Sequence, residues 1–431
     1  MRILILGGAV SGRAAAGLAT RLGYEVTGYD RSPSAAARMR AEGLSWTGGE
    51  WTPALLSAVD VVVTSPGVAP MAPPIVDTIA AGTALWSELE FAARHTDATL
   101  AAVTGTNGKT STVTAAALML EESGVKACAA GNIGTALSDV AQESWDVIVV
   151  EASSFQLAFA HAFHPRAAAI LNVSPDHLDW HRTFDAYADA KARITSNQIP
   201  SDLLAFGADD PAAAGAANVS RAEKVPVSAN RVPEGGAGVV AGRIRIGPMD
   251  FEAPDLPADF LEDAVVGAVL ARKVGATEQG IRRGFSRFRP GPHRRALVGE
   301  WQGVQWVDDS KATNPHAAVA AANGFESVVL IAGGQNKGLD LSPMAMMPTV
   351  RHVFSIGETA EELGRIFDGR PVTITASLSE AVAGAEEVAE RGDTVLLAPG
   401  CASFDMFASY GARGDEFRRL VLARMEAGSG N

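Results

Sequence analysis

The segment TGTNGKT, residues 104–110, combines a glycine-rich turn with a lysine and a threonine. It follows the apolar run TLAAV and precedes a long helical stretch, which is the context of a phosphate-binding loop. In such a loop, backbone amides surround the phosphates, Lys109 reaches the β- and γ-phosphate oxygens and Thr110 ligates Mg²⁺. Val103 stands where the usual motif has glycine. The spacing still predicts a phosphate site formed by Gly105, Thr106, Asn107, Gly108, Lys109, Thr110 and Ser111.

Two candidate metal ligands follow later apolar runs. Glu151 ends the run DVIVVE, and His177 lies just after another run, in NVSPDHLDWH. The carboxyl ends of strands are where open α/β sheets bind their ligands. Mg²⁺ prefers oxygen, which makes Glu151 the natural ligand and His177 the less usual one. Taken alone, His177 would be interpreted as a residue that caps a turn.

Lys191 interrupts the apolar stripe of a helix predicted over residues 184–197. Thr183 is a suitable N-cap, and Tyr187, Lys191 and Ile194 fall on one helical face. A lysine in such a stripe either extends its amine to solvent, which is the commoner outcome, or meets a partner. A desolvated, neutral amine can also react with CO₂ and become an anionic carbamate, an additional oxygen ligand. The sequence leaves these outcomes open.

The last third of the chain has cations and small polar residues after several apolar runs. They lie in the segments PHRR, DDSKATNP, GGQNKG and CASFDMFASY. Each segment alone is compatible with a solvated turn. Because they follow strands of one α/β unit, together they predict a pocket for an anionic substrate, with cations directed toward the phosphates. The candidate residues are His293, Arg294, Asp309, Lys311, Thr313, Lys337, Ser403 and Phe404.

The chain opens with RILILGGAVSG, a strand followed by a glycine turn. A dinucleotide fingerprint reads G-x-G-x-x-G; Gly7 and Gly12 fit it, whereas Ala9 replaces the middle glycine. An alanine-rich helix and a second strand, which ends at Asp30, follow the turn. NAD, another nucleotide bound at the helix N-terminus and a turn without ligand are all compatible with this motif.

Apolar runs alternate with helical stretches along the chain, which predicts an α/β fold of three domains in series. The first is a Rossmann-like domain over residues 1–95. Continuous Val and Ile runs in residues 96–290 predict a central P-loop ATPase domain whose parallel sheet is buried on both faces. Within it, residues 208–260 are rich in Ala, Gly and Pro, with short strand-like pieces such as GRIRIG, and are interpreted as a less regular excursion. After the hinge FRPGPHRR, residues 291–431 form a C-terminal Rossmann-like α/β domain.

The composition of the 431 residues excludes several classes of protein. Hydrophobic residues make up 47% of the chain and charged residues 20%, as in soluble globular proteins. The net charge of −13 argues against nucleic acid as a partner. Two cysteines, Cys128 and Cys401, rule out a disulfide framework and favour the cytoplasm. No apolar run approaches the ~20 residues that span a bilayer, so we expect no membrane insertion.

Several motifs occur together and in a fixed order: TGTNGKT, GNIG at 131–134, EASSFQL, NVSPDHLD, the helix of Lys191, HR and DDSKATNP. In this combination the chain resembles the Mur ligases over essentially its whole length. A phosphate loop with a residue other than glycine at position 103 is that family's own variant. The segment DSKATN is similar to the members that add D-glutamate to UDP-N-acetylmuramoyl-L-alanine. The resemblance implies a three-domain fold.

The resemblance also implies roles for individual residues. The first domain would hold the uridine diphosphate part of the substrate, and not NAD, through Ser11, Gly12, Asp30, Arg31 and Ser65. The central domain would bind ATP and two Mg²⁺ ions, with Thr110 and Glu151 at one ion, His177 at the other, carbamylated Lys191 between them, and Asn132 near the phosphates. The third domain would bind D-glutamate through Thr313, Lys337, Ser403 and Phe404, while Arg294, Asp309 and Lys311 would complete the nucleotide site on domain closure.

The implied activity is an ATP-dependent amide ligation in peptidoglycan precursor synthesis, with Lys109, Lys191 and His177 as catalytic residues. ATP would phosphorylate the substrate carboxylate, and the amine of D-glutamate would then displace the phosphate. We expect a cytoplasmic monomer that acts on small molecules. The alternatives are a Mur-type ligase for another amino acid, a nicotinamide-dependent oxidoreductase and a nucleotide-binding module without catalysis.

One stretch departs from the family pattern. The helix before the hinge usually begins with H-N-x-x-N, whose asparagines approach the nucleotide. Here the stretch PADFLEDAVVG has Phe260 and Asp263 at these positions. An ionised carboxylate accepts hydrogen bonds but donates none, so Asp263 changes what this position can recognise.

Overall fold

The computed structural model describes residues 1–428, with side chains to residue 426. The fold is α/β and contains three sheets, in which most neighbouring strands are parallel. The chain forms two compact units. One comprises Met1–Val173 and Trp180–Phe288, and the other comprises Ser174–Asp179 and the residues from Arg289 onward.

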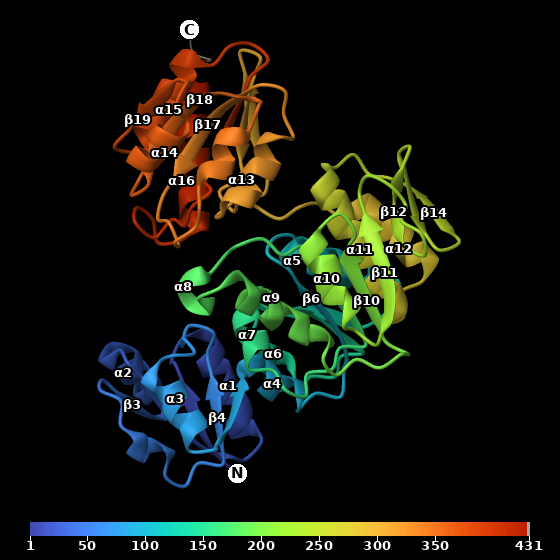
Figure 1. Cartoon of the computed structure of the whole chain (residues 1–431), viewed down its shortest axis with the longest axis vertical. Helices are drawn as coiled ribbons and strands as arrows, with labels where there is room; N and C mark the ends of the chain where they lie inside the picture. Colours follow the sequence, from blue (N-terminus) through green and yellow to red (C-terminus); the bar gives the residue numbers. More distant parts are fainter. Residues whose placement is uncertain (429–431) are drawn as a thin grey trace. The chain divides into compact units, whose positions relative to one another are not determined.

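The first sheet lies in the blue part of the ribbon (Figure 1). It consists of parallel strands in the order β3-β2-β1-β4-β5. Ile3 and Ile5 pack in one apolar cluster with α1, whereas Leu4 and Leu6 pack in another with Ile75 of α3. Because β1 is buried on both faces, its sequence is a continuous apolar run. The strands are β1 (Arg2–Leu6), β2 (Glu25–Asp30), β3 (Ser45–Gly48), β4 (Val61–Thr64) and β5 (Ala84–Ser87). The helices are α1 (Val10–Arg21), α2 (Pro33–Ala41), η1 (Pro53–Leu56), α3 (Pro73–Ala80) and α4 (Glu88–Ala93).

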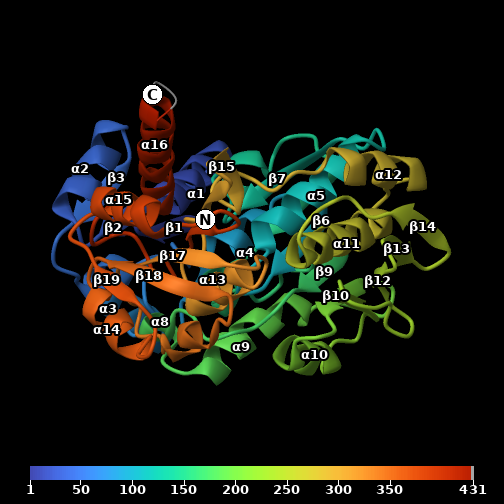
Figure 2. The ribbon, with the colours of Figure 1, turned by 90° about the horizontal axis from the view of Figure 1, so that it is seen from above.

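The second sheet has the order β14-β13-β12-β11-β10-β9-β6-β8-β7, and its strands from β12 to β7 are parallel. Helices α5 and α11 pack against each other beside it (Figure 2). The strands are β6 (Thr99–Thr104), β7 (Ala127–Gly131), β8 (Val147–Glu151), β9 (Ala167–Ile170), β10 (Leu203–Gly207), β11 (Glu223–Ser228), β12 (Ala237–Val240), β13 (Arg243–Ile246) and β14 (Met249–Glu252). The helices are α5 (Lys109–Glu121), α6 (Leu137–Val140), α7 (Ser154–Ala158), α8 (Leu178–His181), α9 (Phe184–Ala192), η2 (Arg193–Thr195), α10 (Pro211–Asn218), α11 (Ala258–Lys273) and α12 (Glu278–Arg287).

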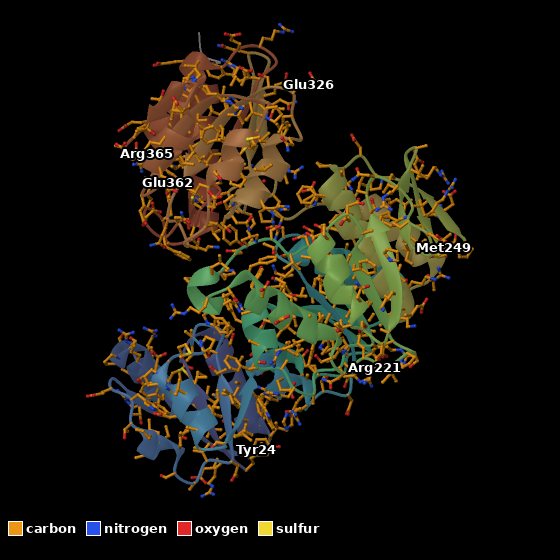
Figure 3. All side chains as sticks on the ribbon, in the orientation of Figure 1. Tyr24, Arg221, Met249, Glu326, Glu362 and Arg365 are labelled. Atoms are coloured by element: carbon orange, nitrogen blue, oxygen red, sulfur yellow. The ribbon has the colours of Figure 1, made fainter. Side chains whose placement is uncertain are left out.

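The interpretation of residues 208–260 as a less regular excursion is wrong. This stretch forms α10 and four strands, and β12, β13 and β14 extend the sheet as antiparallel hairpins. Ile244 and Ile246 are buried while Arg243 and Arg245, which alternate with them, are exposed. Met249 belongs to the edge strand β14 (Figure 3). Gly242 and Gly247 adopt positive φ in the tight turns between these strands. The glycines therefore mark hairpin turns.

The third sheet has the order β15-β16-β20-β17-β18-β19, and all its pairs are parallel except β15 with β16. Val328 and Leu330 pack with α13 and α14 on one face, whereas Val329 and Ile331 pack with α15 and α16 on the other. The strands are β15 (Ala296–Trp301), β16 (Val304–Asp308), β17 (Val328–Gly333), β18 (Val350–Ile356), β19 (Val372–Ile374) and β20 (Thr394–Leu397). The helices are α13 (Pro315–Ala322), η3 (Ser342–Met346), α14 (Ala360–Ile366), α15 (Leu378–Val388) and α16 (Tyr410–Gly428).

Two buried carboxylates of α4 join the first and second sheets in one unit. Glu90 is fully buried and accepts hydrogen bonds from the backbone amides of His161, Ala162 and Phe163, at 2.8–3.0 Å. Glu88 accepts one from the amide of Ser138 at 2.7 Å. Burial raises the pKa of Glu88 above its usual value. These bonds connect the two sheets within the single compact unit to which both belong.

The predicted α/β class with mainly parallel sheets is confirmed. Each of the predicted domains, 1–95, 96–290 and 291–431, contains one of the three sheets. The division at residue 95 and the Rossmann-like character of the outer domains stay predictions. Of the helices described in residues 1–428, none has the length and apolar character needed to cross a membrane.

Candidate active site

The phosphate loop connects β6 to α5. Gly108 caps α5 with φ of 86°, a left-handed conformation that favours glycine. A Cβ atom at Gly108 would lie 2.2 Å from Oδ1 of Asp263. Val103, where the usual motif has glycine, is fully buried in β6 and pairs in register with Glu151 of β8. It is therefore part of the strand, and the tight turn begins only at Gly105.

Lys109 and Asn172 fix the conformation of this loop. Nζ of Lys109 donates hydrogen bonds to the carbonyl oxygens of Gly105 and Thr106, both at 2.8 Å. The amide of Asn107 donates to Oδ1 of Asn172 at 2.8 Å, and the amide of Thr106 donates to its carbonyl oxygen. The sequence reasoning missed Asn172. The sequence feature that could have revealed it is an amide side chain two residues after β9, the strand beside β6.

Thr110, Glu151 and Asn132 meet beside the loop, as the metal and phosphate predictions require. Oγ1 of Thr110 donates to Oε2 of Glu151 at 2.8 Å, and Nδ2 of Asn132 donates to Oε1 at 3.0 Å. Glu151 is 2% exposed. Such oxygen donors suit a hard cation such as Mg²⁺. In addition, the buried hydroxyl of Ser111 has no hydrogen-bond partner within the described part of the chain. The residues present therefore fit a triphosphate with Mg²⁺.

Lys191 does not extend its amine to solvent, although that is the commoner outcome for a lysine in an apolar stripe. It is 1% exposed, and its Nζ donates to the carbonyl oxygen of Gly105 at 2.6 Å. Its amine also lies 4.4 Å from the ring centroid of Tyr187. Thr183 caps α9 as predicted, by accepting from the amide of Ala186. The helix thus presents its lysine to the phosphate loop.

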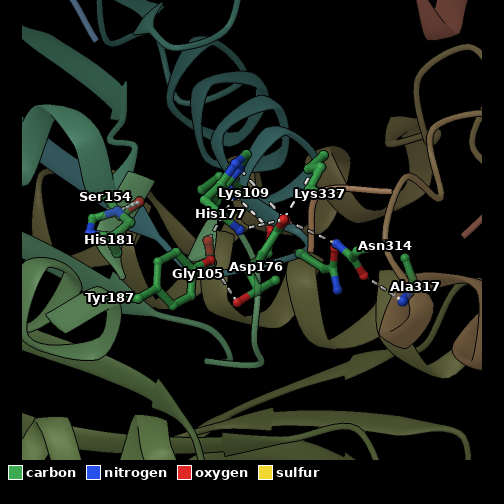
Figure 4. A network of polar contacts seen from close by, with 12 residues as sticks. Gly105, Lys109, Ser154, Asp176, His177, His181, Tyr187, Asn314, Ala317 and Lys337 are labelled. Atoms are coloured by element: carbon green, nitrogen blue, oxygen red, sulfur yellow. Dashed lines mark hydrogen bonds and ion pairs between the residues drawn. The ribbon is translucent and has the colours of Figure 1, made fainter. Parts of the chain in front are cut away.

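His177 lies in the segment Ser174–Asp179, which belongs to the same compact unit as the third sheet. Asp176 beside it accepts hydrogen bonds from Nζ of Lys337 at 3.3 Å and from Nδ2 of Asn314 at 3.4 Å (Figure 4). Burial opposes ionisation of Asp176, but the charges of Lys337 and His177 and the hydrogen bonds to it hold its pKa below the usual value. Asp176 was missed by the sequence reasoning. The metal role of His177 stays a prediction.

The predicted residues of the third sheet lie in loops after three adjacent strands, β16, β20 and β17. Asp309 accepts from the amide of Arg295 at 3.3 Å, and Nζ of Lys311 lies 3.8 Å from the ring centroid of Tyr410. Thr313 and Lys337 belong to two of these loops, and Ser403 and Phe404 belong to the third. Ser403 is buried, whereas Phe404 is 70% exposed.

His293 and Arg294 lie at the start of the same unit. Nδ1 of His293 lies 2.6 Å from Oδ2 of Asp308, at the end of β16. This pairing anchors the hinge segment to the sheet. Arg294 is half-buried. Its predicted role at the nucleotide stays a prediction.

The first glycine turn brings together most of the residues predicted for the uridine diphosphate. Oδ2 of Asp30 accepts from the amide of Gly8 at 2.7 Å, and the hydroxyl of Ser65 donates to the carbonyl oxygen of Gly7 at 3.4 Å. A Cβ atom at Gly12 would lie 1.8 Å from that carbonyl oxygen, so only glycine permits this close packing of helix on turn. Ser11 lies in the first turn of α1, and Arg31 follows Asp30 at the end of β2.

The family departure at Asp263 places a carboxylate against the phosphate loop. Besides its approach to Gly108, Oδ1 of Asp263 lies 3.4 Å from the donating hydroxyl of Thr112. Phe260 is buried. Among the described residues, no three His, Cys, Asp or Glu side chains form a metal-binding group. The predicted ligand set, which includes a threonine and a lysine, stays a prediction.

Comparison with known proteins identifies the family. A model of the Mur ligase middle domain matches residues 103–235, and a model of the Mur ligase, glutamate ligase domain matches residues 293–401. A UDP-N-acetylmuramoylalanine--D-glutamate ligase of Myxococcus xanthus is 38% identical over 446 residues and covers 98% of both chains. A relative of the same name from Frankia casuarinae is 40% identical, with 98% of this chain and 94% of the relative covered.

Solved structures show the same fold. A pseudomurein peptide ligase type C from Methanothermus fervidus superposes with a TM-score of 0.62 at 17% identity, over 98% of this chain and 99% of the other. The UDP-N-acetylmuramate-alanine ligase MurC from Thermotoga maritima has a TM-score of 0.59 at 16% identity, over 98% and 100%. With curated relatives at 38–40% identity along nearly the whole sequence, the chain belongs to the Mur ligase family.

Proposed function

We propose that this protein is an ATP-dependent ligase that joins D-glutamate to UDP-N-acetylmuramoyl-L-alanine in peptidoglycan precursor synthesis. The observation that carries the proposal is the meeting of Thr110 with Glu151 beside the loop that Lys109 spans. This arrangement supports phosphoryl transfer, and the relatives that cover the chain are named for the D-glutamate reaction. We expect a monomer that works in the cytoplasm.

The residues around the phosphate loop would hold ATP and Mg²⁺. Backbone amides of residues 105–111 bind phosphate oxygens, and the ammonium of Lys109 neutralises their charge. Thr110 and Glu151 would hold one ion and His177 the other, with carbamylated Lys191 between them. When bound, Mg²⁺ stabilises the charge that develops on the transferred phosphoryl group. Asn132 orients Glu151 through its hydrogen bond.

The chemistry follows from the weakness of a carboxylate as an electrophile. Transfer of the γ-phosphoryl group to the carboxylate of the muramoyl-alanine substrate gives an acyl phosphate and ADP. The neutral amine of D-glutamate attacks the acyl carbon, and the tetrahedral intermediate expels phosphate to leave an amide. Water would hydrolyse the acyl phosphate, so closure of the domains around it is expected.

The two organic substrates would bind on different sheets. Ser11, Gly12, Asp30, Arg31 and Ser65 hold the uridine diphosphate at the first glycine turn. Thr313, Lys337, Ser403 and Phe404 hold D-glutamate at the third sheet. Arg294, Asp309 and Lys311 complete the nucleotide site when the domains close. The cations among them match the charges of these anionic ligands.

A substrate-panel assay tests this function. Release of phosphate from ATP is expected only when UDP-N-acetylmuramoyl-L-alanine and D-glutamate are both present. The variant Glu151→Gln, which keeps the shape of the side chain but removes its charge, should lower turnover by about 100-fold or more. Faster turnover with L-alanine or diaminopimelate than with D-glutamate would overturn the assignment within the family.

A further inference from the structure

Arg413 lies in the first turn of α16 and is 1% exposed. A guanidinium group has five N–H donors, and each of them is used here. Nε donates to the hydroxyl of Ser310 at 2.9 Å, and Nη2 donates to the carbonyl oxygens of Ser310 and Cys401 at 3.0 and 3.2 Å. Nη1 donates to the carbonyl oxygens of Ala402 and Gly333 at 3.3 and 3.5 Å. One side chain thus binds the loops after β16 and β20 and the last residue of β17, where the third loop begins.

These loops are the ones that carry the residues proposed for D-glutamate. Ser310 is three residues before Thr313, Gly333 is four residues before Lys337, and Ala402 precedes Ser403. The loops follow β16, β17 and β20, which are neighbours in the sheet. Their relative positions are therefore set at the edge of the sheet where Arg413 lies.

The guanidinium group is well suited to this task. Burial lowers the pKa of Arg413 to about 10, so the group remains protonated at neutral pH and keeps all five donors. Its acceptors are one hydroxyl and four carbonyl oxygens, which are fixed parts of the loops. A buried charge is costly unless it is hydrogen-bonded, so the loops and the guanidinium stabilise one another. A lysine, with three donors on one nitrogen, cannot span the same acceptors.

Other contacts attach the start of α16 to the same region. The hydroxyl of Ser310 donates to the carbonyl oxygen of Tyr410 at 2.8 Å, and the ring of Tyr410 lies beneath the amine of Lys311. A Cβ atom at Gly414 would lie 2.1 Å from Nδ1 of His293, so the helix approaches the His293–Asp308 pair closely. The helix and the loops therefore form one continuous cluster of contacts.

We propose that Arg413 is a positioning residue that fixes the three amino-acid-binding loops relative to one another and thereby sets the affinity for D-glutamate. This inference rests on the proposed function, because it takes Thr313, Lys337 and Ser403 as the D-glutamate contacts. Arg413 itself is buried beneath the loops and acts through them. Its loss should therefore affect the binding of D-glutamate more than that of ATP.

The test compares the full-length variants Arg413→Lys and Ser310→Ala with wild type. Arg413→Lys should raise the KM for D-glutamate about tenfold or more, since about 1.4 kcal/mol of lost binding corresponds to that factor. The KM for ATP should change less than about threefold. Ser310→Ala, which removes one of the five acceptors of Arg413 together with the hydroxyl's bond to Tyr410, should show a smaller change in the same direction. Arg419→Lys, an exposed position of the same helix, should leave both constants unchanged.

Hydrogen exchange without substrates provides a readout that does not depend on the ligase activity. In Arg413→Lys, exchange should rise together in residues 309–314, 333–338 and 400–404 but remain as in wild type in α14 and α15. A uniform rise over the unit, or an unchanged KM for D-glutamate in an active wild type, would overturn the positioning role. If wild type does not use D-glutamate, the proposed function fails, and the exchange pattern alone decides whether Arg413 orders the loops. If Arg413→Lys does not fold, the Ser310→Ala variant provides the test. Unchanged hydrogen exchange of that variant in the three loops would then refute the inference.

Discussion

Lys191 is buried where α9 meets the phosphate loop, and its amine donates to the carbonyl oxygen of Gly105. A second amine, that of Lys109, donates to the same oxygen. Two protonated amines at one carbonyl oxygen would repel each other. Conversion of Lys191 to a carbamate would reverse its charge and remove this repulsion. The geometry therefore gives a physical reason for the modification that we propose.

The carbamate makes a specific prediction for Lys191→Ala. Turnover should fall by about 100-fold or more, because an anionic oxygen ligand is lost. Added formate or acetate should restore part of the activity, since a short carboxylate can occupy the vacated space. Initial rates measured against carboxylate concentration provide the check. The exposed-site control Lys224→Ala should keep wild-type turnover with or without added carboxylate, and full activity of Lys191→Ala without it would contradict the carbamate role.

At the scale of elements, two neighbouring acidic residues of α11, Glu262 and Asp263, lie in different environments. Asp263 contacts the phosphate loop, whereas Glu262 accepts a hydrogen bond from the amide of Ala229 at 3.4 Å. Burial raises the pKa of Glu262 to about 7, and the nearby charges of Asp209, Asp259 and Asp210 act in the same direction. The helix therefore contains a carboxyl group that titrates near neutral pH.

The raised pKa of Glu262 makes stability depend on pH. At pH values between 4.5, the usual pKa of a glutamate, and about 7, the pKa of Glu262 in the folded protein, the folded state binds more protons at this group than the unfolded state does. Its contribution to the free energy of unfolding should therefore fall as pH rises through this window, by on the order of 3 kcal/mol, and level off above it. Glu262→Gln should remove this dependence and stabilise the protein at pH 8. Urea unfolding between pH 5 and 8 measures the effect.

A matched variant separates this effect from a general change of charge. Glu234→Gln removes one acidic group from an exposed position in a loop. Its unfolding profile should run parallel to that of wild type across the same pH range. A Glu262→Gln profile that also runs parallel would show that the carboxyl group does not titrate between the two states.

At the scale of the whole molecule, the chain contains three sheets in two compact units. The phosphate loop and Lys191 belong to one unit, and the loops proposed for D-glutamate belong to the other. Compact units with separate apolar cores can unfold separately. The ligands should then stabilise the two units selectively.

Calorimetry tests this division. We expect two thermal unfolding transitions. The midpoint temperature of one of them, that of the unit with the phosphate loop, should rise when a non-hydrolysable ATP analogue and Mg²⁺ are added. At 100 times the dissociation constant, the stabilisation should be about 2.7 kcal/mol. Lys109→Ala should abolish the shift and leave the other transition in place. A single transition that moves as a whole with the nucleotide would contradict independent units.

Local patterns in the sequence were sufficient for much of the fold and of the site. The apolar runs predicted the parallel strands, because a strand buried on both faces has no polar positions. The strand–loop–helix order around residues 104–110, the cap at Thr183 and the shared face of Tyr187, Lys191 and Ile194, all three of them buried, were also correct. In each case the deciding interaction joins residues close in sequence, or follows from the strand–loop–helix order alone. The antiparallel end of the central sheet was predicted only as short strand-like pieces such as GRIRIG, because its glycines were not recognised as hairpin turns.

The tertiary structure alone decided which distant groups meet. Asn172 supports the phosphate loop across 65 positions of sequence, and Asp176 binds Lys337 across 161. Arg413 binds loops as far as 103 positions away. The tertiary structure also showed that the amine of Lys191 faces the carbonyl oxygen of Gly105 and not solvent. Sequence spacing determines which face of its own element a residue occupies, but its partner depends on how strands are ordered in the sheet. Strand order is set by the packing of the whole core, which no local pattern encodes.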